Sequence, residues 1–268
     1  MEGPKVSIIM GVYNCSNYLP NAIDSILKQS YQNWELIMCN DGSTDDTLSV
    51  AKAYAKKYDN IFVLNNDTNR RLAYSLNHCL KYAKGEYIAR MDADDESLPE
   101  RLAIQVKHLE DHPNCDVVGT ALQIRDGDLL TYVRRYPEYP MRQEVWSTVP
   151  FAHPTILMRK KTMDCLNGYR DCKETMRAED LDLWFRFKEQ GFNGYNIQEP
   201  LYIYQESLID YRKRSLEAAI QTSKILAKYY KRLDIQKKYW FLILKPIVAS
   251  LLPNTVMKWY HKRISTMT

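Results

Sequence analysis

The sequence predicts an α/β protein whose mostly parallel sheet carries helices on both faces. Residues 5–95 alternate short apolar runs of strand length with segments whose apolar residues recur at helical spacing. The runs are apolar almost throughout, as expected for strands that are buried on both faces of a parallel sheet. The chain has 268 residues, 45% of them hydrophobic, which is enough for one sizeable core with an appendage or for two small domains.

The elements follow one another in a regular βα order. Strands are expected at residues 5–13, 34–39, 61–64 and 87–91, and helical patterns follow the first three through Leu27, Tyr54 and Leu80. A helix containing Leu102, Val106 and Leu109 and a strand at 116–124 come next. Residues 125–175 show little regular pattern.

Carboxylates follow two of the expected strands. The strand at 87–91 runs directly into Asp92, Asp94 and Asp95, and Asp41 follows the strand at 34–39. Ligands of α/β sheets bind beyond the carboxyl ends of strands, so a D-x-D-D cluster there is suited to holding a divalent cation against a phosphate. The alternatives are a solvated acidic turn for the cluster and a turn-forming role for Asp41.

Several classes of protein lack support. No G-x-G-x-x-G follows the first strand and no G-x-x-x-x-G-K-[ST] occurs, which argues against a dinucleotide-binding Rossmann enzyme and a P-loop NTPase. The start of the chain shows no signal-peptide pattern. Six scattered cysteines without a C-x-x-C pair suit a reducing cytosol.

The charge is distributed unevenly along the chain. Residues 211–268 hold 13 Lys and Arg against 2 Asp and Glu, whereas residues 1–210 carry a net charge of −7. The apolar run at 239–253 is interrupted by Lys245 and Pro246, and it is shorter than the roughly 20 residues of a transmembrane helix. It predicts an amphipathic helix at an anionic membrane surface. A helical arm that packs on the rest of the chain or forms a homo-oligomer is the alternative, and we expect no nucleic-acid partner.

Five segments, in this order and at roughly this spacing, resemble the family 2 glycosyltransferases. They are VSIIMGVYN at 6–14, NDGSTDDT at 40–47, GEYIARMDADD at 85–95, FAHP at 151–154 and AEDLDLWFR at 178–186. The resemblance covers about residues 5–206. It implies a GT-A type catalytic domain over residues 1–210, and residues 211–268 are then a basic, amphipathic helical C-terminal region.

The resemblance also implies a donor site for a nucleotide sugar. Tyr13 would stack on the base, and Asp41 would accept a hydrogen bond from the base N3–H, which favours UDP. Arg71 would reach the base or the diphosphate. Asp94 would be the direct ligand of Mn²⁺ or Mg²⁺, with Asp92 directed to the ribose and the metal-bound waters. The cation would bridge the diphosphate oxygens and so make the departure of the diphosphate leaving group feasible.

The acceptor side is implied by the third acidic motif. Asp180 matches the general base of an inverting transferase, which takes the proton from the attacking hydroxyl. Glu179 is the next candidate, and a pair that caps the helix at 181–187 is the alternative. His153 is a candidate for the acceptor side or for a further metal ligand. Residues 125–175 are expected to hold the acceptor specificity.

The predicted function is that of a metal-dependent inverting transferase of the hexosyl or N-acetylhexosaminyl class. It would move a sugar from a UDP-sugar to a glycan or lipid-linked saccharide in surface polysaccharide synthesis, at the inner face of the cell membrane. Transfer to a polyprenyl phosphate is one alternative. A D-x-D phosphatase would need its acidic pair after the first strand, and a non-enzymatic metal-binding module would leave Asp41 and the Glu179-Asp180 pair unexplained.

Overall fold

The computed structural model describes residues 5–146, 149–206 and 215–253. Its strands are β1 (Val6–Val12), β2 (Trp34–Asn40), β3 (Ile61–Asn65), β4 (Tyr87–Arg90), β5 (Glu96–Ser97), β6 (Val117–Asp126), β7 (Leu129–Arg134), β8 (Leu157–Arg159) and β9 (Gly194–Gln205). The α-helices are α1 (Leu19–Leu27), α2 (Thr47–Lys57), α3 (Arg71–Leu80), α4 (Arg101–Asp111), α5 (Lys160–Cys165), α6 (Glu179–Glu189), α8 (Leu216–Arg232) and α9 (Lys245–Leu251). Short 3-10 helices are η1 (Pro140–Arg142), η2 (His153–Thr155), η3 (Lys173–Thr175) and η4 (Lys237–Leu244).

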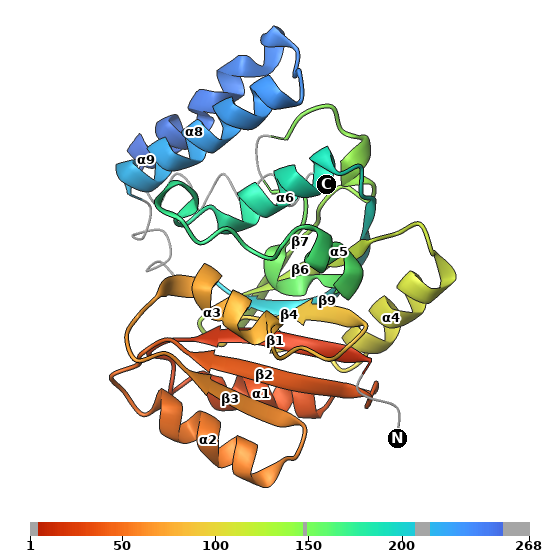
Figure 1. Cartoon of the computed structure of the whole chain (residues 1–268), viewed down its shortest axis with the longest axis vertical. Helices are drawn as coiled ribbons and strands as arrows, with labels where there is room; N and C mark the ends of the chain where they lie inside the picture. Colours follow the sequence, from red (N-terminus) through yellow and green to blue (C-terminus); the bar gives the residue numbers. More distant parts are fainter. Residues whose placement is uncertain (1–4, 147–148, 207–214, 254–268) are drawn as a thin grey trace.

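The N-terminal half of the sheet is parallel, as the sequence predicts. Its strand order is β3-β2-β1-β4, and β1 pairs in register with both β2 and β4 (Figure 1). All four strands therefore end at the same edge of the sheet. The loops that carry the predicted donor residues leave from that edge.

The other half of the sheet is mixed. From β4 the order continues β8-β6-β9-β5, where β8 lies antiparallel to both of its neighbours and β6 runs parallel to β9. The hairpin of β6 and β7 turns at Gly127, whose φ of 62° favours glycine. The antiparallel pairs of β8 interrupt the parallel arrangement of the first four strands, and β6 and β9 are again parallel.

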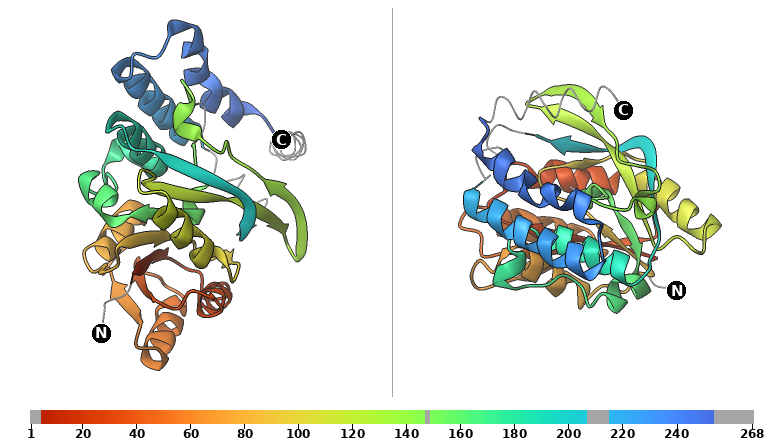
Figure 2. Two further views of the ribbon diagram at one scale, coloured as in Figure 1. Left: turned by 90° about the vertical axis from the view of Figure 1, so that its right-hand side faces the viewer. Right: turned by 90° about the horizontal axis from the view of Figure 1, so that it is seen from above.

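Helices cover both faces of the sheet, which confirms the predicted fold class (Figure 2). Successive strand residues point to opposite faces. Ile8 and Met10 join one core cluster with residues of α1, α2 and α4, whereas Ile9 and Ile37 join another with residues of α3, α5, α6 and α8. Two buried faces explain why the strand sequences are apolar throughout.

The C-terminal helices pack on the second of these clusters. Leu226, Tyr229 and Tyr230 of α8 are almost fully buried. The Tyr229 hydroxyl donates to Asp182 Oδ1 at 2.7 Å, and the Tyr230 hydroxyl donates to the carbonyl of Trp146 at 2.7 Å. The α8 helix thus shares a core with α6.

Part of the predicted C-terminal region cannot be compared with the structure. Residues 211–214 and 254–268 lie outside the described residues, and the domain boundary at residue 210 stays a prediction. Among the helices that the structure describes, none combines the length and the apolarity needed to span a bilayer.

The packing of α8 predicts that its apolar face stabilises the whole fold. Leu226 is 1% exposed, so Leu226→Ala should lower the free energy of unfolding by about 2–5 kcal/mol, in one transition shared by all optical probes. Lys224→Ala, on the exposed face of the same helix, should change it by less than about 0.5 kcal/mol. Urea unfolding measures both. A separate early transition for the α8 variant would show that the C-terminal region unfolds independently.

Candidate active site

Predicted donor residues gather where the parallel strands end. Tyr13 follows β1, Asp41 follows β2 and Asp92 follows β4. The loops after β1 and β2 are joined, because the Asn14 side-chain oxygen accepts a hydrogen bond from the backbone N–H of Thr44 at 2.9 Å. The edge of the sheet therefore presents one continuous surface of loops.

Tyr13 provides an exposed aromatic ring on this surface. Its side chain is 48% exposed, although it directly follows a strand with almost no exposed residue. A ring held by a rigid strand and open on one side is a suitable platform for stacking a nucleotide base.

Asp41 organises the loop between β3 and α3. Its carboxylate is buried and accepts hydrogen bonds from the Asn66 amide at 2.8 Å, the Ser75 hydroxyl at 2.9 Å and the backbone N–H groups of Arg70 at 2.9 Å and Arg71 at 2.8 Å. Three of these hydrogen bonds go to Oδ1, and the bond from Arg71 goes to Oδ2. A carboxylate oxygen can accept two hydrogen bonds. Asp41 thus combines a structural role with remaining capacity to accept a bond from a ligand.

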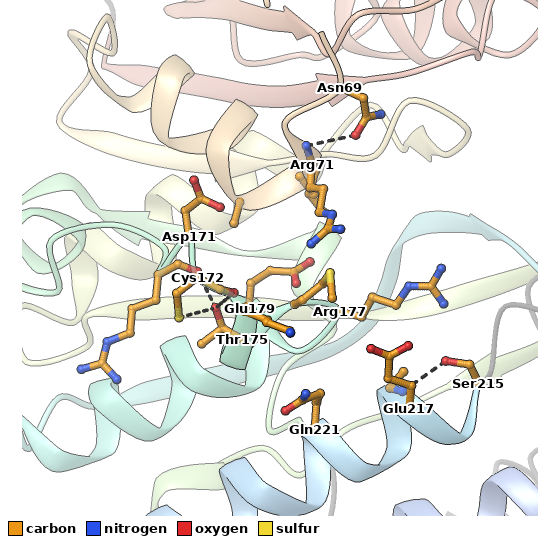
Figure 3. A pocket seen from close by; sticks show the side chains of 16 residues that line it. Asn69, Arg71, Asp171, Cys172, Thr175, Arg177, Glu179, Ser215, Glu217 and Gln221 are labelled. Carbon is orange, nitrogen blue, oxygen red and sulfur yellow. Dashed lines mark hydrogen bonds between the residues drawn. The ribbon is translucent and has the colours of Figure 1, made fainter.

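Arg71 adopts a backbone conformation that is unusual for a residue with a side chain. Its φ is 72°, in the left-handed region, and its N–H also lies 3.2 Å from the side-chain oxygen of Asn69. This conformation costs a non-glycine residue about 1–2 kcal/mol. Figure 3 shows its guanidinium group directed into a cavity of about 980 Å³ that α3, the segment 170–177 and the start of α8 enclose. Strain of this kind concentrates at functional sites.

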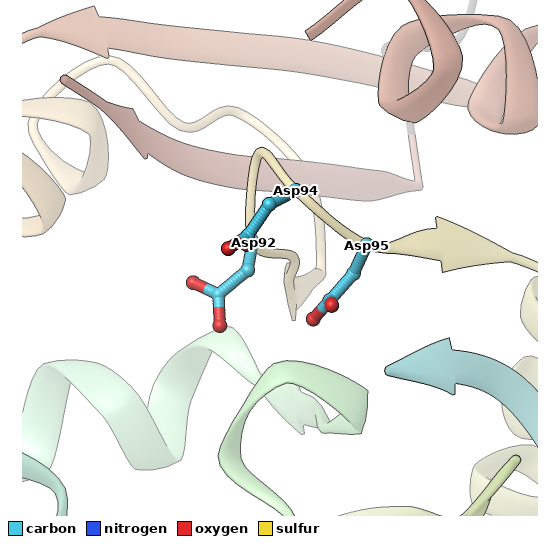
Figure 4. Close-up of side chains that lie close together, drawn as sticks. All are labelled: Asp92, Asp94 and Asp95. Carbon is cyan, nitrogen blue, oxygen red and sulfur yellow. The ribbon is translucent and has the colours of Figure 1, made fainter. Parts of the chain in front are cut away.

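Asp92, Asp94 and Asp95 form a cluster at the end of β4. Each can bring a carboxylate oxygen within 4.8 Å of the others (Figure 4). Asp94 is exposed, whereas Asp95 is buried and accepts a hydrogen bond from the backbone N–H of Gln205 at 2.8 Å. Burial and then the charges of Asp92 and Asp94 raise the pKa of Asp95 well above its usual value.

The cluster fits a divalent cation of the Mg²⁺ or Mn²⁺ type. Carboxylate oxygens are the ligands that such hard cations prefer. The second oxygen of Asp95, Oδ2, is buried and has no hydrogen-bond partner among the described residues, so it is available as a ligand. Asp92 and Asp94 were expected as the metal ligands, and Asp95 completes a set of three.

Arg90 supplies positive charge next to this cluster. Its guanidinium group is buried and forms an ion pair with Asp92. Its Nε and Nη1 have no hydrogen-bond partner among the described residues. Arg90 was not among the predicted site residues, although a cation within the apolar strand YIARM needs a counter-charge and is a signal of a site.

Glu179 and Asp180 occupy the first turn of α6, and both line a second, smaller cavity that Arg90 and Asp92 also line. Burial, and then the charge of Asp180, raise the pKa of Glu179 to about 7. Burial raises the pKa of Asp180 as well, while the neighbouring Arg90 charge opposes that shift. Both carboxyl groups are therefore stronger bases than carboxylates in water, as general-base chemistry requires.

Asp182 lies two residues further along α6 and has a different environment. It is buried and binds Arg186 Nε at 2.7 Å, Arg170 Nη1 at 3.0 Å and the Tyr229 hydroxyl at 2.7 Å. These partners hold α6 against the loop before it and against α8. The first turn of α6 thus separates an anchoring carboxylate from those that face the cavity.

His153 lies beside these groups. Its Nε2 is 2.9 Å from the Tyr169 hydroxyl, and burial followed by the Arg90 charge holds its pKa well below the usual value, so the ring is neutral. Within the described residues, the cluster of close metal-binding side chains does not include His153. His153 instead lines the same cavity as Glu179 and Asp180, the predicted acceptor-side residues.

This second cavity, of about 270 Å³, contains residues predicted for the donor side and for the acceptor side. It is lined by Asp92 from the end of β4, by Asp180 from the start of α6, and by Arg90 and His153. Arg134, Tyr136 and Tyr204 also line it. These three were not predicted, because they come from β7, from the segment after β7 and from β9, where no motif distinguishes them.

Comparison with known proteins identifies the family. Residues 7–166 match the family described as glycosyl transferase family 2. The chain belongs to glycosyl transferase family 2. It is 46% identical over 263 residues to EpsE of Bacillus subtilis (strain 168), named as a glycosyltransferase, with 98% of this chain and 95% of that protein covered. It is 26% identical to TuaG of the same organism, named for teichuronic acid biosynthesis, with 90% and 94% covered.

Solved structures share the fold of this family 2 glycosyltransferase. S. aureus TarS in complex with UDP gives a TM-score of 0.62 at 21% identity, covering 92% of this chain and 81% of that one. The mannosyltransferase PcManGT from Pyrobaculum calidifontis, in complex with GDP-Man and Mn²⁺, gives 0.65 at 20% identity, covering 99% and 81%. Both likenesses confirm the predicted GT-A type fold.

The raised pKa of Glu179 predicts a pH-dependent cost in stability. The unfolded chain has the usual pKa near 4.5 and the folded chain about 7, so folding becomes less favourable as the pH rises from 4.5 to 7 and the cost is constant above that. Glu179→Gln removes the charge and should be more stable than the wild type at pH 8, by up to about 3 kcal/mol, and equally stable near pH 4.

Urea unfolding in EDTA at the two pH values measures this difference. Glu217→Gln, which removes an exposed carboxylate lining the larger cavity, is the control and should change stability little at pH 8. If Glu179→Gln is no more stable than the wild type at pH 8, the carboxyl group is not desolvated in the folded protein.

Proposed function

We propose that this glycosyltransferase moves a sugar from a UDP-sugar to a hydroxyl group of a glycan or a lipid-linked saccharide, with inversion at the anomeric carbon. The observation that carries the proposal is the shared cavity of Asp92 and Asp180. Asp92 and Asp94 would hold the diphosphate end of the donor, and Asp180 would face the acceptor. An inverting displacement needs its base on the side opposite to the leaving group, and carboxylates from two different elements of one cavity would suit that arrangement.

The proposed chemical step uses residues of this chain. Asp180 accepts the proton of the acceptor hydroxyl as its oxygen forms a bond to the anomeric carbon, and the bond from that carbon to the diphosphate oxygen breaks. Asp180 begins with a raised pKa, which suits it to take this proton. Arg90 orients Asp92 through their ion pair. A hydroxyl nucleophile benefits from a base, whereas a polyprenyl phosphate is already deprotonated, so the carboxyl pair favours a hydroxyl acceptor.

Asp94, Asp92 and the Asp95 oxygen that has no hydrogen-bond partner among the described residues would hold Mn²⁺ or Mg²⁺. Such a cation would neutralise negative charge on the departing diphosphate. The fold neighbour PcManGT was solved with Mn²⁺, which supports the assignment.

Two further considerations support a UDP-sugar and a role in surface polysaccharide synthesis. Asp41 can accept one more hydrogen bond, which suits the N3–H of uracil, and Tyr13 offers a ring for stacking. Neighbour TarS binds UDP, and the relative TuaG is named for the synthesis of teichuronic acid. We place the reaction at the cytoplasmic face of the cell membrane, where lipid-linked acceptors are accessible.

Release of UDP from a panel of UDP-sugars, with and without Mn²⁺ or Mg²⁺, tests the donor and the metal. The wild type should release UDP from one of them only with the cation, and EDTA should abolish this reversibly. Asp94→Ala should lose the activity and bind UDP more weakly in the presence of the cation. Full activity in EDTA would show that the reaction needs no cation. Turnover of GDP-sugars and of no UDP-sugar would show that the donor nucleotide is GDP.

Substitutions at two carboxylates of α6 separate catalysis from structure. Asp180→Asn keeps the shape of the side chain, so it should lower kcat by about 10² to 10⁴-fold while UDP affinity stays unchanged and the melting temperature does not fall. Asp182→Asn should instead lower the melting temperature, because Arg186 and Arg170 lose their charged partner. Near-normal turnover by Asp180→Asn would show that the general base is Glu179 or another group.

A further inference from the structure

The helical segment formed by η4 and α9 exposes a stripe of apolar side chains. Phe241, Leu244, Val248 and Leu251 are 67%, 57%, 57% and 71% exposed. They recur at intervals of three and four residues, so they lie along one face. Trp240 and Leu252 are 40% and 42% exposed. We call these six residues the C-terminal stripe.

The opposite side of this segment is already packed. Tyr239, Leu242 and Ile243 contact the core cluster that contains α6 and α8. The α9 helix lies beside α8, as Figures 1 and 2 show. The segment is therefore apolar on two sides, one partly buried against the protein and the other facing outward. Scattered exposed apolar residues need no explanation, but a continuous stripe on a docked helix indicates a binding surface.

Basic side chains accompany the stripe. Residues 215–253 carry seven Lys and Arg against two Asp and Glu. Six of these cations are exposed, namely Lys224, Lys228, Lys231, Arg232, Lys237 and Lys238. The remainder of the chain up to residue 210 is net negative, so the molecule has a strong charge asymmetry that would orient this end toward a negative surface.

We propose that the C-terminal stripe lies in the interface of an anionic lipid membrane. Trp, Phe and Leu side chains on one face with lysines beside them are the pattern of helices that lie in the plane of a membrane. The apolar groups enter the acyl boundary and the lysines reach the headgroups. A second copy of the chain is a poorer match, because two such surfaces would place like charges together and lysine is depleted at protein interfaces.

Membrane binding here would also position the active site. The N-cap residue Ser215 and residues Glu217 and Gln221 of α8 line the large cavity into which Arg71 points (Figure 3). Glu179 lines that cavity and the catalytic one. If α9 lies on the membrane, the neighbouring α8 would keep the cavity near lipid-linked acceptors. This consequence rests on the proposed function, whereas lipid binding itself does not.

Co-sedimentation of the full chain with vesicles tests the proposal without any substrate. The vesicles contain phosphatidylcholine alone or phosphatidylcholine mixed with phosphatidylglycerol. The wild type should bind the mixed vesicles and lose affinity at high salt. Combining Phe241→Ser, Leu244→Ser and Val248→Ser should weaken binding at least about tenfold, because each side chain contributes apolar area. Combining Lys237→Gln and Lys238→Gln should weaken it by about fivefold per lysine.

The matched control replaces Leu129 and Leu130 of β7 by serine. These leucines are 72% and 56% exposed, far from the C-terminal helices in sequence and outside the stripe. The control should bind vesicles like the wild type, and all variants should keep the wild-type melting temperature. The proposal is overturned if the wild type ignores mixed vesicles, or if the triple variant binds them normally.

Two further outcomes would also overturn it. A wild type that is dimeric by light scattering and ignores vesicles, with a monomeric triple variant, would assign the stripe to a second copy. Salt-sensitive retention on DNA without vesicle binding would assign the basic surface to nucleic acid. Failure of UDP-sugar turnover leaves the vesicle result unaffected, so the two proposals fail separately.

Discussion

The ion pair of Arg90 with Asp92 is the interaction on which the rest of the site depends. Three partly buried carboxylates, Asp92, Glu179 and Asp180, line one cavity, and the buried Asp95 lies close to Asp92. A desolvated negative charge is costly without a partner. Arg90 is the buried cation that opposes the raised pKa of both Glu179 and Asp180. Its Nε and Nη1 have no hydrogen-bond partner among the described residues, which is costly for stability and typical of a group that serves a binding site.

A second constraint acts at the donor end. The buried carboxylate of Asp41 binds two successive backbone N–H groups, and this contact holds Arg71 in the left-handed conformation. The strain at Arg71 and the excess negative charge near Arg90 are independent costs, and both occur at the carboxyl edge of the parallel strands. Strained or uncompensated groups that lower stability are common at ligand-binding sites. A ligand that binds only the folded protein restores the lost stability.

The sequence was informative wherever the interactions are local. Apolar runs such as VSIIM predict the parallel strands because both faces are buried, and acidic loops predict the site because parallel strands end together. The arrangement of β8, β6 and β9 could not be predicted, since pairing between distant segments leaves no periodicity. Arg134 and Tyr136 reach the cavity through that pairing, and they were not predicted for the same reason. The basic charge of α8 suggested a separate region, although Tyr229 and Tyr230 bury their rings and satisfy their hydroxyls in the core of α6.

The connection between α8 and the catalytic carboxylates follows from helix geometry. Residues two apart on a helix point about 200° apart, so Asp180 and Asp182 face opposite sides of α6. Asp182 is fixed by Arg186, Arg170 and the Tyr229 hydroxyl, and it thereby sets the rotation of the first helical turn. The direction in which Asp180 points is a consequence of that rotation. The C-terminal helix thus helps to orient the proposed base, and its packing links the outer stripe to the carboxyl group that would accept the proton.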